Sequence, residues 1–280
     1  MLSLNKNHTE IDLIQVNATA LNIIRLDQND PFVCGNKWLK LSLNITDQHE
    51  RYATFGGPHS NHLHAFSYAC KLLNKPHFVF VRGIGPKDTP TLIDIQNNQG
   101  QIIRLSKKDY AQKHDTQMQQ RWQNLYGDMA FIPEGGDNEL AKQGCQKWFS
   151  SLNLPDNAIV GVSIGTGCTF TGFARALKQN QTLVGLPAFY AHQPMIDELL
   201  ASDTKGTLKI LNAQNHERFA KMDDQQLNQM LAFEDQHKIL LEPVYTGKTL
   251  FRLVEHYSKQ ESRPIYFIHT GGLQGRRATL

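Results

Sequence analysis

The sequence predicts an α/β fold with open, mostly parallel sheets, and three observations lead to that prediction. Short runs rich in β-branched and aromatic residues alternate with longer amphipathic runs along the whole chain. Three glycine-rich turns each follow a predicted strand directly, as ligand-binding turns do in such folds. The 280 residues are enough for a large core, in one domain or two. Repeated strand–helix alternation implies a parallel sheet covered on both faces.

The predicted strands are bounded by polar or glycine-containing turns. They comprise residues 21–26, 51–55, 77–81, 101–105, 129–133, 158–163, 183–186, 208–211 and 264–269. Helices are predicted for 60–74, 139–152 and 248–260, where apolar residues recur at helical spacing. Residues 107–123 are polar, but their spacing suits an exposed helix.

The stretch PEGGDN at 133–138 is the most plausible boundary between two domains. We therefore predict a larger domain made of residues 1–42 and 134–280, and a smaller domain made of residues 43–133. The cofactor or substrate would lie between them.

Charge and composition exclude several classes of protein. The net charge of +3, from 29 basic and 26 acidic residues, is too even for a nucleic-acid or polybasic membrane surface. No apolar run approaches the ~20 residues that span a bilayer. The N-terminal stretch MLSLNKNHTEIDLIQ has charges where a signal peptide needs apolar residues. Four scattered cysteines form no CxxC pair, which argues against a disulfide scaffold or structural zinc, so we expect a cytoplasmic, reduced protein.

Three glycine-rich turns, at 56–62, 163–169 and 269–272, are expected to face one cleft because each follows a strand. The turn SIGTGCT (163–169) has the form of an anion cradle: its glycines allow close backbone approach, and Thr166 and Thr169 offer hydroxyls. A phosphate group would fit there. An ordinary turn with a threonine cap explains the same residues, so this turn alone leaves both interpretations open.

Neither nucleotide signature is complete. The dinucleotide fingerprint needs a glycine where Phe170 stands. This mismatch weakens the case for a nicotinamide-dependent oxidoreductase. A nucleoside-triphosphate loop ending at Gly247-Lys248-Thr249 would need a glycine where Glu242 stands. Small phosphate-bearing cofactors therefore remain as candidates for the ligand of the glycine-rich turn.

His59, His62 and His64 invite a metal-site interpretation, but no further ligand cluster has suitable spacing, and we expect no metal. These histidines are more simply cap or surface residues. Ser60 likewise has a plain interpretation as a helix N-cap.

Four motifs occur in a fixed order: GNK at 35–37, GGxxSNH at 56–62, GTGxT at 165–169 and HTGG at 269–272. In this respect the chain resembles the pyridoxal-phosphate-dependent family that contains 1-aminocyclopropane-1-carboxylate deaminase and D-cysteine desulfhydrase. The resemblance spans roughly residues 22–272. It implies the two-domain fold of the tryptophan synthase β-subunit, known as fold type II, and it implies pyridoxal 5′-phosphate as cofactor.

The resemblance also implies a role for each motif residue. Lys37 would form the Schiff base with the cofactor and act as the catalytic base, and burial beside Trp38 and Leu39 would lower its pKa. Ser60 would bind the substrate carboxylate or move a proton, and Tyr245 would assist proton transfer. Cofactor contacts are implied for Lys37, Asn61 (at the ring hydroxyl), Gly165, Thr166, Gly167, Cys168, Thr169 and Thr270 (at the ring nitrogen).

The activity implied is α,β-elimination from a small amino acid, first of all D-cysteine, giving pyruvate, ammonia and sulfide. Family members that open the cyclopropane ring carry a tyrosine on the last strand, where this chain most naturally has Phe267 and places Tyr266 one step earlier. The alternatives are 1-aminocyclopropane-1-carboxylate deaminase activity, and a non-catalytic pyridoxal-phosphate-binding protein. The resemblance further implies a homodimer, with no nucleic-acid or membrane partner.

Overall fold

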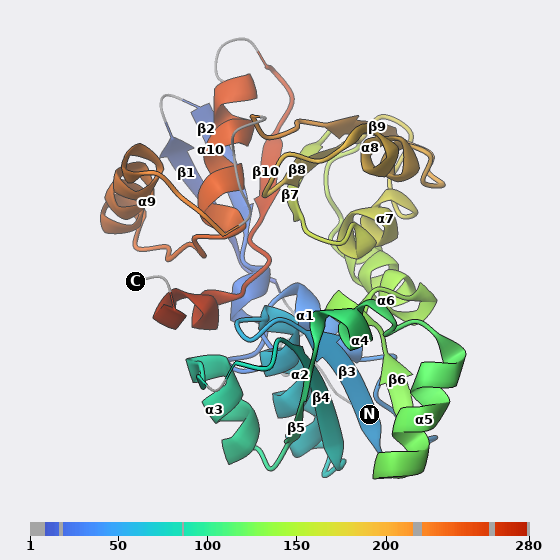
Figure 1. Ribbon diagram of the computed structural model, residues 1–280. Coiled ribbons are helices and arrows are strands. Elements are labelled where there is room, and N and C mark those ends of the chain that lie inside the picture. The colour runs from blue at the N-terminus through green and yellow to red at the C-terminus, as the bar shows by residue number, and fades with distance from the viewer. Residues whose placement is uncertain (1–8, 17–18, 86, 215–219, 258–260, 279–280) are drawn as a thin grey trace.

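The computed structural model describes residues 9–16, 19–85, 87–214, 220–257 and 261–278, and its strands form two sheets (Figure 1). The larger sheet has the order β1 (Ile11–Val16), β2 (Thr19–Ile24), β10 (Ile265–Ile268), β7 (Ile159–Ile164), β8 (Thr182–Pro187) and β9 (Thr207–Ile210). The smaller sheet has the order β5 (Gln101–Leu105), β4 (His77–Arg82), β3 (Tyr52–Gly56) and β6 (Ala130–Ile132).

The prediction of mostly parallel sheets is confirmed. Every pairing in both sheets is parallel except that of β1 with β2, which are antiparallel neighbours. Each of the nine predicted strands is present, with ends displaced by two residues at most. Strand β1 was not predicted, because it is an edge strand whose Ile11 and Leu13 face solvent, and its pattern differs from that of a buried parallel strand.

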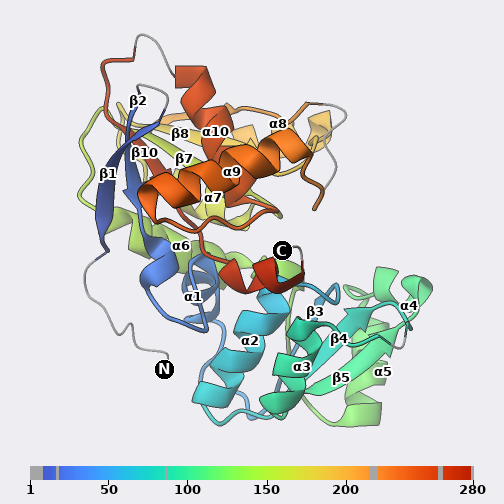
Figure 2. The ribbon, with the colours of Figure 1, turned by 90° about the vertical axis from the view of Figure 1, so that its left-hand side faces the viewer.

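Helices cover both faces of both sheets (Figures 1 and 2). Their bounds are α1 (Asn36–Leu41), α2 (Asn61–Leu72), α3 (Pro90–Asn97), α4 (Lys107–Ala111), α5 (Thr116–Tyr126), α6 (Glu139–Ser150), α7 (Cys168–Ala174), α8 (Gln193–Leu200), α9 (Asp224–His237) and α10 (Thr246–Tyr257). Short 3₁₀ helices η1 (Leu26–Gln28), η2 (Glu134–Gly136) and η3 (Leu273–Ala278) complete the set.

The helices predicted for 60–74, 139–152 and 248–260 correspond to α2, α6 and α10, although 258–260 lie outside the described residues. The single exposed helix predicted for 107–123 is wrong. Two helices occupy this region, because Asp115 accepts a hydrogen bond from the Met118 backbone N–H (2.8 Å) and so begins a second helix. Tyr110 and Trp122 from this pair are buried against the smaller sheet.

Alternating residues on each central strand divide the core of the larger sheet into two layers. Ile159 packs with Phe233 of α9 and Leu253 of α10, whereas Val160 lies in the cluster on the other face, which contains Phe173 of α7. A fully buried phenylalanine of this kind contributes on the order of 2–3 kcal/mol. The smaller sheet is enclosed in the same way, with α2 and α3 on one face and α4 and α5 on the other.

All four strands of the smaller sheet lie between residues 52 and 132, and all strands of the larger sheet lie outside that range. The predicted domain division, with residues 1–42 and 134–280 in one part and residues 43–133 in the other, stays a prediction. Figure 1 shows the two sheets one above the other, with α1 and α6 between them. The turns that follow β3, β7 and β10 come together at this junction.

The chain makes a very close crossing where Gly35 meets Thr270. The Asn36 backbone N–H donates to the Thr270 carbonyl (3.2 Å), and a Cβ on Gly35 would lie 1.9 Å from that oxygen. Gly35 also has a φ of +68°, which side chains disfavour. Only glycine can therefore bring the beginning of α1 against the last glycine-rich turn.

We expect Gly35→Ala to reduce the free energy of unfolding by about 3 kcal/mol or more, because it combines a backbone clash with positive-φ strain. Urea unfolding of the purified protein measures this. Gly85→Ala is the matched control, since a Cβ there meets no atom within 4 Å. Equal stabilities for the two variants would contradict the role given to this crossing.

Candidate active site

A cavity of about 520 Å³ lies between the two sheets and gathers the glycine-rich turns into one site. Nine of the ten residues predicted for the site line it: Lys37, Ser60, Asn61, Gly165, Thr166, Gly167, Thr169, Tyr245 and Thr270. The exception is Cys168, whose buried thiol faces the Gly136 carbonyl (3.8 Å) instead of the cavity. The expectation that the three turns share a cleft is met.

The loop between β7 and α7 has the features of a phosphate cradle. Among the described residues, the backbone N–H groups of Gly165, Thr166 and Gly167 have no backbone acceptor. Gly167 is left-handed (φ +95°), and a Cβ on it would come within 2.7 Å of Leu199. The Thr169 hydroxyl accepts a hydrogen bond from the Asn36 amide (2.9 Å), which ties the loop to α1. Unsatisfied N–H groups at glycines are the donor set that a phosphate group requires.

Lys37 extends from the first turn of α1 to the cavity, and its Nζ donates to Asn36 Oδ1 (2.8 Å). Burial, and next the positive charge of Lys40, lower the pKa of Lys37 to about 7. An ordinary lysine has a pKa near 10.4, so its neutral amine is scarce at neutral pH. A lysine with such a pKa can act as a nucleophile and as a base at neutral pH. The catalytic role that the resemblance implies for Lys37 stays a prediction.

Lys40 is a functional candidate that the sequence analysis missed. It lies one helical turn after Lys37, is 4% exposed, and lines the same cavity. Its Nζ donates to the Gly135 carbonyl (3.0 Å), and no carboxylate pairs with it among the described residues. A buried cation without a counter-ion is costly, and a bound phosphate dianion would offset that cost. The signal in the sequence was the i, i+3 spacing of the two lysines.

The cavity thus fits pyridoxal phosphate, on the evidence of its own atoms. The N–H groups of the Gly165–Gly167 loop, which have no backbone acceptor among the described residues, and the buried Lys40 cation suit the phosphate. The Lys37 amine suits the aldehyde. Asn61 and Thr270 line the remaining walls, where polar groups can meet the ring. The cofactor supplies electron withdrawal from the substrate α-carbon, which a protein side chain cannot provide.

Ser60 caps α2, as its plain interpretation predicted. Its Oγ accepts from the backbone N–H groups of His62 (3.2 Å) and Leu63 (3.4 Å). With its lone pairs directed to these donors, the hydroxyl hydrogen remains available to the cavity. The arrangement favours Ser60 as a hydrogen-bond donor to the cavity, because an oxygen that already accepts twice is a weak proton acceptor.

Glu242 is a second candidate that the sequence analysis missed as a functional residue. Its carboxylate is 1% exposed at the cavity wall and accepts from the backbone N–H groups of Val244 (3.0 Å) and Tyr245 (2.7 Å). Burial raises the pKa of Glu242 to about 7 despite these bonds. Burial, and next the Glu242 charge, also raise the pKa of Tyr245, so its phenol stays protonated at neutral pH. The loop therefore places one protonated phenol and one titratable acid in the cavity.

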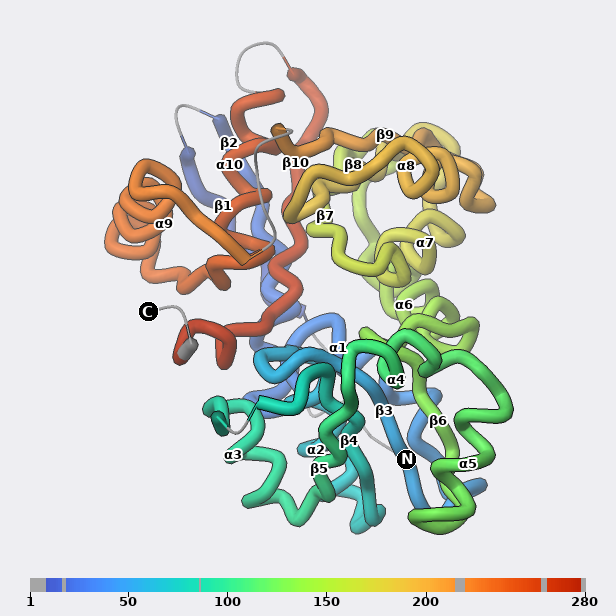
Figure 3. The backbone as a smooth tube through the Cα atoms, viewed as in Figure 1, coloured from blue at the N-terminus to red at the C-terminus, as the bar shows by residue number. Residues whose placement is uncertain are grey.

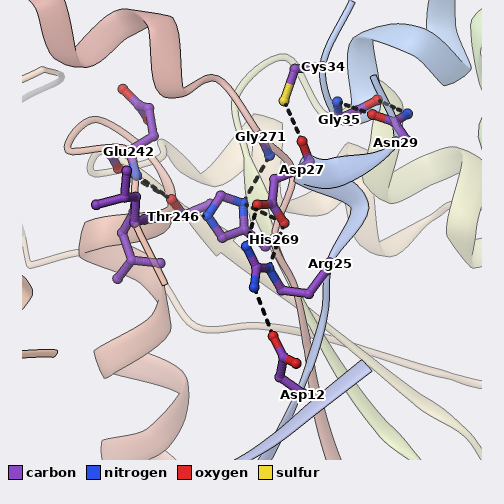
Figure 4. Close-up of polar contacts among 12 residues, drawn as sticks. Asp12, Arg25, Asp27, Asn29, Cys34, Gly35, Glu242, Thr246, His269 and Gly271 are labelled. Carbon is purple, nitrogen blue, oxygen red and sulfur yellow. Dashed lines mark hydrogen bonds and ion pairs between the residues drawn. The ribbon is translucent and has the colours of Figure 1, made fainter. Parts of the chain in front are cut away.

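A buried polar network supports the HTGG turn from below (Figure 4). The Gly271 backbone N–H donates to His269 Nδ1 (3.1 Å), so His269 Nε2 carries the proton and donates to the Leu240 carbonyl (2.7 Å). Asp27 lies 3.7 Å from the same Nδ1 and is held by Arg25 (2.8 Å). Burial lowers the pKa of His269, which keeps the ring neutral. These contacts fix the backbone that presents Thr270.

The three histidines considered as metal ligands have separate partners. His62 Nε2 contacts the Thr54 hydroxyl (2.8 Å), His64 Nε2 pairs with Asp94 (3.2 Å), and His59 is exposed at the cavity rim. Within the described residues, no group of three or more histidine, cysteine, aspartate or glutamate side chains is arranged to hold a metal ion.

No helix of the described chain is long and apolar enough to cross a membrane.

The low pKa of Lys37 predicts how the rate of reaction with an aldehyde depends on pH. The initial rate at which the apo-protein combines with pyridoxal should rise about tenfold per pH unit below 7 and level off above it, because only the neutral amine attacks. Stopped-flow absorbance with pyridoxal, which has no phosphate ionisation of its own, measures this rate. A rate that still rises steeply between pH 8 and 10 would show that Lys37 keeps an ordinary lysine pKa.

Comparisons with known proteins agree with this geometry, although no protein-family model matches the chain. It is 27% identical, over 92% of its length and 74% of the relative, to the mitochondrial bifunctional D-cysteine desulfhydrase/1-aminocyclopropane-1-carboxylate deaminase of Arabidopsis thaliana. It is 24% identical, over 86% of its length and 85% of the relative, to a putative 1-aminocyclopropane-1-carboxylate deaminase of Thermotoga maritima.

Among solved structures, an ACC deaminase homologue superposes with a TM-score of 0.82 at 19% identity, covering 98% of this chain and 92% of that one. At that identity the superposition establishes the fold, which is fold type II, as predicted. The two curated relatives extend over most of the chain, and the cavity has the residues that the cofactor requires. By sequence and by fold, this chain is similar to the pyridoxal-phosphate-dependent enzymes of the 1-aminocyclopropane-1-carboxylate deaminase and D-cysteine desulfhydrase family.

Proposed function

We propose that this protein is an enzyme that eliminates sulfide from D-cysteine, converting D-cysteine and water into pyruvate, ammonia and hydrogen sulfide. The observation that carries the proposal is the position of Lys37. An amine with a pKa of about 7 reaches the same cavity as the phosphate loop and the Ser60 hydroxyl. The Arabidopsis relative is named for both desulfhydrase and deaminase activities, which supports this pair of reactions.

Each side chain has a part in the proposed reaction. Ser60 donates a hydrogen bond to the substrate carboxylate and so orients the α-carbon. Lys37 accepts the proton from that carbon, because about half of its amine is neutral near pH 7. Tyr245, which stays protonated, donates a proton to the departing thiolate. The turns around the cavity exclude bulk water while these transfers occur.

We favour elimination over cyclopropane-ring opening because of the tyrosines. Phe267 is fully buried in the core of the larger sheet, and Tyr266 also lies outside the cavity. Among the described residues that line the cavity, Tyr245 is the one tyrosine. The second tyrosine that the resemblance associates with ring opening is therefore not at this site. Deaminase activity on 1-aminocyclopropane-1-carboxylate remains the second candidate, supported by the names of both relatives.

The test is a substrate panel with the pyridoxal-phosphate-loaded protein. D-Cysteine, L-cysteine, D-serine and 1-aminocyclopropane-1-carboxylate are compared, with sulfide, ammonia and 2-oxo acid measured separately. The proposal expects sulfide and pyruvate in equal amounts from D-cysteine, and little ammonia from the cyclopropane substrate. Ammonia from the cyclopropane substrate alone would favour the second candidate. Cofactor binding with no turnover of any substrate would point to a non-catalytic binding protein.

We also propose a reducing, cytoplasmic setting and a homodimer. Cys34, Cys70, Cys145 and Cys168 are all free and buried, which suits a compartment that does not form disulfides. Leu13 on edge strand β1 is 70% exposed, and an exposed apolar edge favours contact with a second copy. Light scattering of the purified protein tests the dimer, and fractionation of the source cells tests the compartment.

A further inference from the structure

The 3₁₀ helix η3 contains Gln274, which does not line the cavity but contacts Asn61, a residue that does. Gln274 Nε2 donates to Oδ1 of Asn61 (2.9 Å), the first residue of α2. Figure 3 shows the end of the chain lying between α9 above and α3 below, next to the junction of the two sheets. Gln274 therefore connects the larger sheet's last segment to a cavity residue of the smaller part.

Two glycines hold the Asn61 amide closely against η3. A Cβ on Gly272 (φ +89°) would lie 2.7 Å from Asn61 Nδ2, and a Cβ on Gly275 would lie 3.1 Å from Asn61 Oδ1. A side chain at either position would push the amide away. Among the described residues, the hydrogen bond that the Asn61 amide makes is the one from Gln274.

The helix η3 is itself anchored on both sides. Arg276 pairs with Glu234 of α9 (2.5 Å) and donates to the Leu241 carbonyl (2.5 Å). Arg277 pairs with Asp94 of α3, which also contacts His64 of α2. These contacts fix Gln274 relative to both parts of the molecule, so that it can hold Asn61 in a defined orientation.

An amide side chain has one acceptor oxygen and one donor nitrogen, and a bond to one of them decides what the other offers. Because Asn61 Oδ1 accepts from Gln274, Nδ2 is left as the group for the cavity, and it donates to no acceptor among the described residues. A donor at this place suits a ring oxygen that has lost its proton. An acceptor would repel it.

We propose that Gln274 is a positioning residue that fixes the Asn61 amide with its nitrogen toward the cofactor's ring oxygen. The inference rests on the proposed pyridoxal-phosphate chemistry and extends it to a residue outside the cavity wall. Gln274 is placed to act through Asn61 alone, without contact to cofactor or substrate.

Two substitutions of Gln274 test whether it sets the orientation of the Asn61 amide or only contacts it. Gln274→Leu removes the bond and leaves the Asn61 amide free to turn. Gln274→Glu keeps the shape but offers only acceptors, so Asn61 Nδ2 should turn toward it and leave Oδ1 facing the ring oxygen. We expect the Kd for pyridoxal phosphate to rise about tenfold in Gln274→Leu, the size of one hydrogen bond to a charged oxygen, and further in Gln274→Glu. The visible absorption band of the bound cofactor should shift in both variants.

The control is a double-mutant cycle with Asn61→Ala. If Gln274 acts through Asn61, Gln274→Leu has no further effect on cofactor Kd in the Asn61→Ala background. The exposed Gln120, which donates to Asn124 (3.2 Å) on α5, supplies the matched glutamine–asparagine pair. Gln120→Glu should leave both Kd and spectrum unchanged.

Wild-type affinity and spectrum in Gln274→Glu would overturn the inference, and so would an undiminished effect of Gln274→Leu in the Asn61→Ala background. A wild-type protein that binds no pyridoxal phosphate would instead overturn the proposed function, and the inference with it. The titration of the unmodified protein therefore separates the two failures before any variant is compared.

Discussion

Lys37→Ala is expected to lower the rate of pyruvate release from D-cysteine on the order of 10⁴-fold, with pyridoxal phosphate present in excess. The substitution removes the cavity amine that attacks the cofactor and the group proposed to take the α-proton, and general-base catalysis alone is commonly worth 10²–10⁴-fold. Lys40 is the other lysine among the described residues that line the cavity, and it cannot replace Lys37 because its Nζ is engaged with the Gly135 carbonyl. Coupled assay of pyruvate, with sulfide measured in parallel, gives the ratio.

The matched control is Lys238→Ala, which removes an exposed lysine that pairs with exposed Asp235 (3.0 Å) on the protein surface. That variant should keep wild-type turnover. Lys37→Ala should also unfold at a higher temperature than the wild-type apo-protein, because the wild type pays to bury an amine whose pKa falls from about 10.5 to about 7. Turnover within tenfold of wild type in Lys37→Ala would remove Lys37 from the mechanism.

The sequence was most informative where one rule decides the structure. Strands buried on both faces, such as Ile159–Ile164 and Thr182–Pro187, must be mostly apolar, and they were located within two residues. Strand β1 was missed because its exposed edge lacks that pattern. The break between α4 and α5 depended on the Asp115 side chain capping the second helix, a local choice that helical spacing cannot show.

In the active site, sequence motifs located the residues that lie together in one short segment. They did not locate residues that only folding brings to the cavity. The glycine loops and Lys37 lie in short recognisable segments, and the cavity contains them. Lys40 and Glu242 were missed because a lysine and a glutamate are ordinary surface residues until the fold buries them to 4% and 1% exposure. Gln274 was missed because its partner, Asn61, is 213 positions away along the chain. The Cys168 thiol faces away from the cavity, which its place in the loop did not reveal.

Lys40→Met is expected to weaken the binding of pyridoxal phosphate by about 10²–10⁴-fold, measured at pH 9. Removing the buried cation leaves a phosphate dianion in a cavity wall without its counter-charge, and breaking such a buried pair costs about 3–5 kcal/mol. Methionine keeps most of the volume of the buried stem, so the packing around α1 should persist. Titration of the apo-protein, followed by visible absorption, gives the dissociation constant.

Pyridoxal without the phosphate is the control that identifies the interaction. Its affinity should change less than about threefold in Lys40→Met at pH 9, where most of the Lys37 amine is neutral in the wild type. The pH dependence of the reaction with pyridoxal is a second, independent measurement. Because the Lys40 charge lowers the pKa of Lys37, its removal should move the pH at which the reaction rate is half-maximal to a higher value. Equal losses for both aldehydes, with an unchanged midpoint, would mean that Lys40 supports α1 and does not meet the phosphate. A phosphate-specific loss with a raised midpoint requires the charge itself, because a packing role would weaken both aldehydes alike.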